Sequence, residues 1–151
     1  MKRLEQTDMQ KNSPQFRLII DSNLWISFLI SDKQRKLDRL LFLDQVKILF
    51  SVELLNELTK ISQYPKLKSY FKQNAIEEML LNLEPYIELI EIKSNVQICR
   101  DHKDNFLLNL AKDGKANFLL TGDKDLLVLQ KIGKTSIISI SEFLEKIKRI
   151  N

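Results

Sequence analysis

The hydrophobic positions of the chain form short continuous runs that alternate with longer runs of helical spacing. The continuous runs predict buried strands over residues 16–20 (FRLII), 46–50 (VKILF), 87–92 (IELIEI), 117–121 (NFLLT) and 135–140 (TSIISI). Between them, apolar residues that recur every three or four positions predict helices over 22–30, 36–45, 51–62, 66–71, 74–86, 104–114 and 141–150. This alternation predicts an α/β domain around a mainly parallel sheet of about five strands.

Residues that favour helix ends support this pattern. Ser51 and Ser141 stand where N-caps belong, and Gly114 stands where a C-cap glycine belongs. Residues 1–14 are polar and have no periodicity, which predicts a flexible N-terminal tail before a single domain over residues 15–151.

Composition narrows the possible chemistry and location. No apolar run approaches the roughly 20 residues that span a bilayer, and the N-terminus lacks the apolar core of a secretory signal. The single Cys99 fits a reducing compartment, so we expect a cytoplasmic protein without membrane contact. With one His and one Cys in the chain, a metal ion would have to be held by carboxylates.

The net charge of +4 is mild, and the 24 basic residues are scattered along the chain. This charge is compatible with a polyanionic partner such as nucleic acid. It is equally compatible with an ordinary solvated, lysine-rich surface. Charge therefore permits a nucleic-acid partner without selecting one.

Two acidic residues follow predicted strands. Asp21 comes directly after the first strand, and Asp123 follows the fourth strand and Gly122. Parallel strands place their carboxyl ends at one edge of the sheet, so Asp21 and Asp123 converge if their strands are neighbours. Either residue alone is also a common turn or N-cap residue.

A third acid lies at the start of a predicted helix. Asp104 continues the apolar stripe of Leu107, Leu108 and Ala111 toward the helix N-terminus. An unpaired carboxylate on a buried face is unfavourable, which indicates a functional site. The alternative is that Asp104 caps the helix and interacts with its dipole.

A fourth acid borders the apolar face of the helix over 51–62. Glu57 lies beside the stripe of Leu54, Leu58 and Ile61. It is either part of the same acidic site or a rim carboxylate paired with a lysine. Clustered carboxylates repel one another, and a hard divalent cation such as Mg²⁺ or Mn²⁺ relieves this repulsion. The four acids together therefore indicate metal-dependent phosphoryl-transfer chemistry.

Four segments, in this order, resemble the PIN-domain nucleases, and specifically the VapC-like toxins of bacterial toxin–antitoxin systems. They are LIIDSNLWIS, FSVELLNELTKI, CRDHKDNFLLNLA and FLLTGDKDLL, and the resemblance extends from Phe16 to Ile147. It implies a three-layer α/β/α fold and Mg²⁺- or Mn²⁺-dependent endoribonuclease activity on RNA. It also implies a homodimer and a cognate antitoxin protein.

Transferred residue by residue, the resemblance implies a catalytic and metal-binding set of Asp21, Glu57, Asp104 and Asp123. It implies auxiliary roles for Asn23, Asp101, Thr121 and Asp125. Asp125 is open between an outer metal contact and the N-cap of a short helix over 126–130. His102 departs from the family pattern, because related toxins often carry proline there, and we assign it no catalytic role.

Two other functions remain compatible with the sequence. One is a catalytically silent PIN-like module that binds RNA or protein, and the other is a nuclease for structured DNA. An aspartyl phosphatase is disfavoured because position 23 is Asn where a second Asp is needed. Trp25 is interpreted as a core or dimer-contact residue, and Cys99 as a small structural residue.

Overall fold

The computed structural model describes residues 16–30, 46–71 and 74–150, and the structural statements below concern these ranges. The tail expected over residues 1–14 and the helix expected over 36–45 lie outside the described residues. No helix in the described ranges is both long and apolar enough to cross a membrane.

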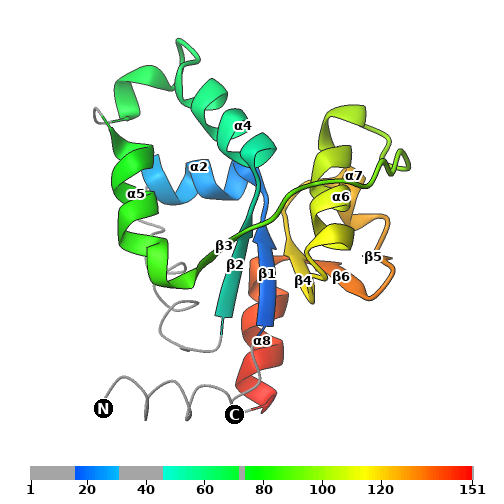
Figure 1. The fold of residues 1–151 in the computed structure, drawn as a ribbon. Helices are drawn as coiled ribbons and strands as arrows, with labels where there is room; N and C mark the ends of the chain where they lie inside the picture. Colours follow the sequence, from blue (N-terminus) through cyan, green and yellow to red (C-terminus); the bar gives the residue numbers. More distant parts are fainter. Residues whose placement is uncertain (1–15, 31–45, 72–73, 151) are drawn as a thin grey trace.

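A six-stranded sheet forms the centre of the domain (Figure 1). Its spatial order is β3 (Ile87–Leu89), β2 (Val46–Phe50), β1 (Phe16–Ile20), β4 (Phe118–Leu120), β6 (Thr135–Ile138) and β5 (Lys131–Ile132). Every pairing is parallel except that of β5 with β6. The five predicted strands are confirmed, although the third, fourth and fifth are shorter than expected. The expected number of strands was too low, because β5 has only two residues and no detectable apolar periodicity.

Helices alternate with the strands along the chain. The α-helices are α2 (Ser22–Ile30), α4 (Val52–Ser62), α5 (Ala75–Leu83), α6 (Asn105–Asp113), α7 (Lys124–Leu127) and α8 (Ile140–Ile150). Short 3-10 helices are η1 (Lys68–Tyr70), η2 (Glu84–Tyr86) and η3 (His102–Asp104). The helix expected over 66–71 is thus only the 3-10 turn η1. The one expected over 74–86 divides into α5 and η2, consistent with Pro85 in its last turn.

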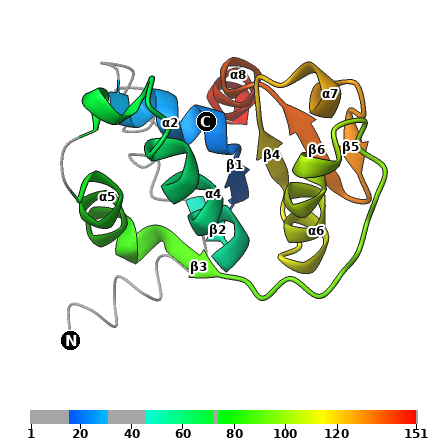
Figure 2. The same cartoon turned by 90° about the horizontal axis from the view of Figure 1, so that it is seen from above.

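The sheet is covered on both faces, as the α/β/α expectation requires (Figure 2). The alternation of side chains along β1 determines which helix each face meets. Phe16 and, from β4, Phe118 pack against Phe143 of α8, with ring centroids 6.0 and 5.1 Å apart. Arg17 points to the opposite face, where its Nε donates to the carbonyl of Gly114 at the end of α6 (2.9 Å). The three-layer fold is therefore confirmed.

The largest buried side chain, Trp25, belongs to α2 and packs toward the sheet. Trp25 is fully buried, and its ring contacts those of Phe28 and Phe50, with centroids 6.1 and 5.2 Å apart. The core interpretation of Trp25 is confirmed. Met79 and Leu83 of α5 are also buried, as the helical spacing of α5 predicts.

Two of the three expected helix-end residues take their expected positions. Ser51 caps α4, its Oγ accepting from the backbone N–H of Leu54 (3.1 Å). The Ser141 prediction is wrong, because α8 begins at Ile140 and Ser139 accepts from the N–H of Glu142 (3.1 Å).

Gly114 ends α6, but close packing rather than a left-handed backbone makes glycine necessary there. Its φ is −85°. An added Cβ would lie 2.7 Å from Leu49 Cδ1 and 2.9 Å from the carbonyl oxygen of Leu110. A side chain at this position would therefore displace Leu49 and press against the Leu110 carbonyl of its own helix.

Candidate active site

The two central strands of the sheet bring the first pair of site residues together. β1 and β4 are parallel neighbours, with Ile20 opposite Leu120. The next residue on each strand is Asp21 and Thr121, and the N–H of Asp21 donates to the carbonyl of Leu120 (3.0 Å). The expected proximity of the two strand exits is confirmed.

Asp21 is a buried carboxylate with defined hydrogen-bond donors. Its exposed fraction is 4%. The Thr121 hydroxyl donates to Oδ2 (2.5 Å), and the backbone N–H of Asn23 donates to Oδ1 (3.3 Å). Burial raises the pKa of Asp21 more than these hydrogen bonds lower it, and the negative charge of Asp123 raises it further. Asn23 itself has an exposed side chain and acts here through its backbone.

The Thr121 hydroxyl links Asp21 to the loop that carries Asp123. While donating to Asp21, Thr121 Oγ1 accepts from the N–H of Asp123 (3.0 Å). Asp123 is the N-cap of α7, and its Oδ1 accepts from the N–H of Asp125 (2.9 Å). The N-cap alternative for Asp125 is therefore wrong, because α7 begins at Lys124 and not after Asp125.

Asp104 lies at the N-cap position of α6, yet its side chain forms no capping hydrogen bond. Its Oδ2 is buried and accepts no hydrogen bond from a donor among the described residues. Burial is the largest cause that raises the pKa of Asp104 to about 7. A side-chain hydrogen bond with Asp123, which favours the protonated carboxyl, comes next, and the negative charges of Asp21, Asp123 and Asp101 follow. The capping alternative therefore does not describe this side chain. Its buried oxygen without a donor and its acidic neighbours instead indicate a position for a proton, shared with Asp123, or for a cation.

Asp101 lies at the rim of this cluster. Its side chain is exposed and caps η3 by accepting from the N–H of Lys103 (3.1 Å). Because its charge contributes to the raised pKa of Asp104, Asp101 adds to the same negative region.

Glu57 is half-buried on α4, a helix that packs against both α2 and α6. In the described ranges it forms no ion pair with a lysine, which was the alternative interpretation. The strongest influences on the pKa values of Asp21 and Asp104 come from groups other than Glu57. Its membership of the site stays a prediction.

The carboxylates are electrostatically coupled without forming a complete ligand set. Across the described ranges, no three His, Cys, Asp or Glu side chains lie close enough together to hold a metal ion. The chemistry of the donors nevertheless fits a hard cation, since all are carboxylates and Asp104 Oδ2 is buried without a partner. A bound ion would need side-chain movement or water molecules to complete its coordination.

Two nearby residues have the ordinary roles expected of them. His102 is exposed on η3. Cys99 is buried, and burial raises the pKa of its thiol, which makes it unreactive. Its backbone N–H donates to Oδ1 of Asn105 (2.9 Å), a buried residue for which the sequence pattern suggested no role.

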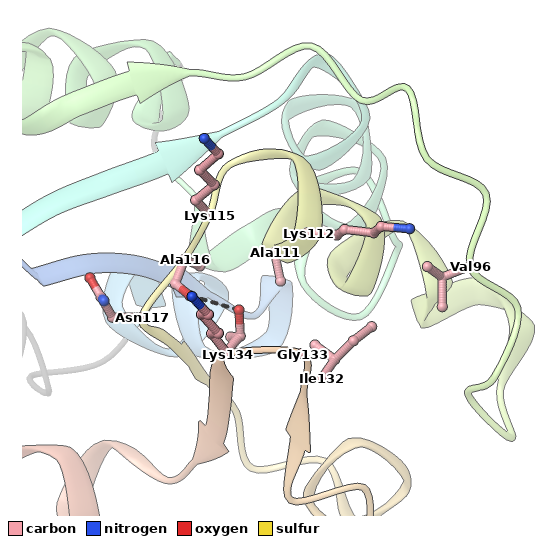
Figure 3. Close-up of a pocket in the computed structure, with 10 residues that line it drawn as sticks. Val96, Ala111, Lys112, Lys115, Ala116, Asn117, Ile132, Gly133 and Lys134 are labelled. Atoms are coloured by element: carbon pink, nitrogen blue, oxygen red, sulfur yellow. Dashed lines mark hydrogen bonds between the residues drawn. The ribbon is translucent and has the colours of Figure 1, made fainter.

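A separate pocket of about 510 Å³ lies at the opposite end of α6 (Figure 3). Its walls are largely apolar, and Lys112, Lys115 and Lys134 stand at its rim. In Figure 3 the three ammonium groups point in different directions. They form no convergent anion site in this arrangement, so the carboxylate cluster is the better candidate for catalysis.

The fold and the site together define a class of protein: an α/β/α domain with coupled carboxylates at the ends of adjacent parallel strands. Residues 17–125 match the PIN domain family, and the chain belongs to it. PIN domains are generally nucleases and typically use divalent metal ions. The chain is also similar to the uncharacterized protein MJ1680 of Methanocaldococcus jannaschii. The two are 32% identical over 121 residues, which cover 78% of this chain and 77% of that protein.

Proposed function

We propose that this protein is a Mg²⁺- or Mn²⁺-dependent endoribonuclease. The main supporting observation is the group of Asp21, Thr121, Asp123 and Asp104, in which one buried carboxylate oxygen of Asp104 accepts no hydrogen bond. This group lies at the carboxyl ends of β1 and β4, where α/β domains bind their ligands.

In this proposal Asp21, Asp104 and Asp123 hold one or two divalent ions, directly or through water. A bound Mg²⁺ or Mn²⁺ supplies a water of lowered pKa and neutralises charge on the phosphodiester. Thr121 keeps Asp21 oriented through its short hydrogen bond. Glu57 orients the attacking water or accepts its proton. Asn23, Asp101 and Asp125 are auxiliaries at the rim.

The reaction is an in-line attack of water on a phosphodiester of RNA. The P–O3′ bond breaks, which leaves a 5′-phosphate and a 3′-hydroxyl. The net charge of +4 favours approach of a polyanionic substrate, because long-range attraction raises its local concentration.

The biological role that we propose is that of the toxin of a toxin–antitoxin pair. It rests on the resemblance of four ordered segments to VapC-like toxins. It includes a homodimer, a cognate antitoxin that blocks the site, and a cytoplasmic location.

One observation favours a second function, a catalytically silent module that binds RNA or protein. The acids in the described ranges are not close enough to form a metal-ligand set. A silent module would bind RNA without cleaving it and would show no specific Mn²⁺ binding. Calorimetric Mn²⁺ titration of the wild type, with Asp104→Asn as the comparison, separates the two functions.

The direct test is cleavage of RNA in Mg²⁺ or Mn²⁺, compared with EDTA. Asp21→Asn and Asp123→Asn should abolish cleavage, while Glu145→Gln, an exposed acid on α8, serves as the matched control. Cleavage that persists in EDTA or in either Asn variant contradicts the mechanism. A preference for structured or flapped DNA over RNA would keep the chemistry and overturn the substrate.

A further inference from the structure

One face of α6 carries a row of polar residues that the catalytic proposal does not use. Asn105, Asn109 and Asp113 are spaced by four, so they lie above one another on the helix. They face residues 90–101, the extended segment between β3 and η3, which passes around α6 in Figure 2.

The two asparagines accept hydrogen bonds from the backbone of this segment. Asn105 Oδ1 accepts from the N–H of Cys99 (2.9 Å), and Asn109 Oδ1 accepts from the N–H of Val96 (2.5 Å). Both asparagines are buried, with exposed fractions of 7% and 8%. Their side-chain carbonyls thus accept from the backbone of the segment as the main-chain carbonyls of a neighbouring strand would.

Asp113 holds the beginning of the same segment. Its Oδ2 accepts from the backbone N–H groups of Lys93 (2.6 Å) and Ser94 (2.8 Å), and its Oδ1 accepts from the Ser94 hydroxyl (2.5 Å). Burial alone would raise the pKa of Asp113, but these hydrogen bonds lower it below its usual range. Asp113 is therefore a charged anchor.

The hydrogen bonds run in order along both partners. Asp113, near the C-terminal end of α6, accepts from residues 93 and 94. One turn toward the N-terminus, Asn109 accepts from residue 96, and a further turn on, Asn105 accepts from residue 99. The segment belongs to no strand or helix, so four of its backbone donors depend on these side chains. We call Asn105, Asn109 and Asp113 the α6 ladder.

The segment ends at the carboxylate cluster. Beyond Cys99 it leads to Asp101 and then to η3, whose last residue is Asp104. It also contacts Asp125, which follows β4. The Cys99 thiol faces the carbonyl of Asp125 (3.9 Å), and Arg100 Nη1 lies 3.8 Å from Asp125 Oδ1. The path of the segment therefore determines where the Asp101 loop meets the Asp125 loop.

We propose that the α6 ladder positions the active site by holding residues 93–99 in place, which locates Asp101 and η3 beside the catalytic acids. Its three members are positioning residues and contact neither substrate nor metal. The expected effect of the ladder on RNA cleavage rests on the proposed ribonuclease function. Its expected effect on the position of residues 93–104 does not.

The test compares Asn109→Leu, which removes the acceptor at nearly constant size, with Asn109→Asp, which keeps it. Thr135→Val is the matched control, because it removes another buried hydrogen bond, Thr135 Oγ1 to the Ala116 carbonyl (2.7 Å), at the far end of the sheet. Three quantities are measured: hydrogen exchange of residues 93–104, Mn²⁺ affinity and RNA cleavage.

In Asn109→Leu we expect exchange of residues 99–104, beyond the lost hydrogen bond itself, to accelerate about tenfold. We expect Mn²⁺ affinity and cleavage to fall by about the same factor. Asn109→Asp should stay within about twofold of the wild type in all three. Thr135→Val should lower the melting temperature and leave the three quantities unchanged.

Asp113→Ala, at a half-buried position, tests the same point if Asn109→Leu does not fold. Unchanged exchange of residues 99–104 overturns the proposal, and so does faster exchange with unchanged Mn²⁺ affinity. If the wild type cleaves no RNA, the proposed function fails, and exchange together with Mn²⁺ affinity still decides the role of the ladder.

Discussion

Removal of the Asp104 charge should stabilise the protein in the absence of metal while destroying its proposed activity. The carboxyl is surrounded by Asp21, Asp123 and Asp101, and one of its oxygens is buried without a partner. Asp104→Asn keeps the shape of the side chain and removes the charge. The charged carboxylate of Asp104 is thus predicted to lower the protein's free energy of unfolding at neutral pH.

The magnitude follows from the pKa of Asp104. Its rise from 3.8 to about 7 corresponds to about 4 kcal/mol at most, since one pKa unit is ~1.4 kcal/mol. Asp104 is half-buried, so solvent screening reduces the expected gain to about 1–3 kcal/mol. In a domain of this size that gain raises the melting temperature by roughly 3–10 °C.

The sign of the pH dependence is definite. Between pH 3.8 and about 7 the folded state binds more protons at Asp104 than the unfolded state. Wild-type stability therefore falls as the pH rises through this window. Because asparagine does not titrate, the advantage of Asp104→Asn grows over the same window and is complete only above about pH 7.

The assay is urea unfolding in EDTA at pH 5 and pH 8. The gain at pH 5 should be clearly smaller than that at pH 8. Asp113→Asn, the same substitution at the other end of α6, should destabilise, since hydrogen bonds lower the pKa of Asp113. Equal gains at both pH values, or no gain at pH 8, would refute the reasoning. Added Mn²⁺ should remove the advantage if the metal proposal is correct.

Three further predictions test other contacts. Thr121→Val should lower stability by about 1–3 kcal/mol, measured by urea unfolding, because it leaves the buried carboxylate beside it without its hydroxyl donor. Arg17 and Glu88 form a paired contact (2.6 and 3.1 Å) that is partly exposed, so a double-mutant cycle should yield about 0.5–1 kcal/mol, reduced by salt. The hydrogen bond from Arg17 lowers the pKa of Glu88, so this coupling should be fully present above about pH 4.5 and be lost as the pH falls through the lowered pKa. Gly114→Ala should cost about 1–3 kcal/mol through overpacking, and an unchanged melting temperature would contradict the close approach.

The sequence by itself determined the parts of the structure that depend on local periodicity. The apolar runs predicted five of the six strands, because a buried parallel strand must be apolar on both faces. The strand exits at Asp21 and Asp123 followed from where those runs end. Local chemistry was also sufficient for Ser51, whose side chain reaches the backbone only three residues away.

Where two nearby residues could cap the same helix, only the tertiary structure decided between them. Ser139 rather than Ser141 caps α8, since β6 ends at Ile138 and the helix starts early. Likewise, α7 starts directly after Asp123, which makes Asp123 the cap in place of Asp125. The two candidate caps of each helix have similar capping propensities, so the point at which the preceding strand ends selects between them.

The convergence of distant residues also required the tertiary structure. Only the adjacency of β1 and β4 places Thr121 against Asp21, one hundred residues away. Only the path of residues 90–101 around α6 gives Asn105, Asn109 and Asp113 their partners. Strand order and burial depend on the packing of the whole chain, and these two properties create the coupled charges and the unpaired oxygen of Asp104.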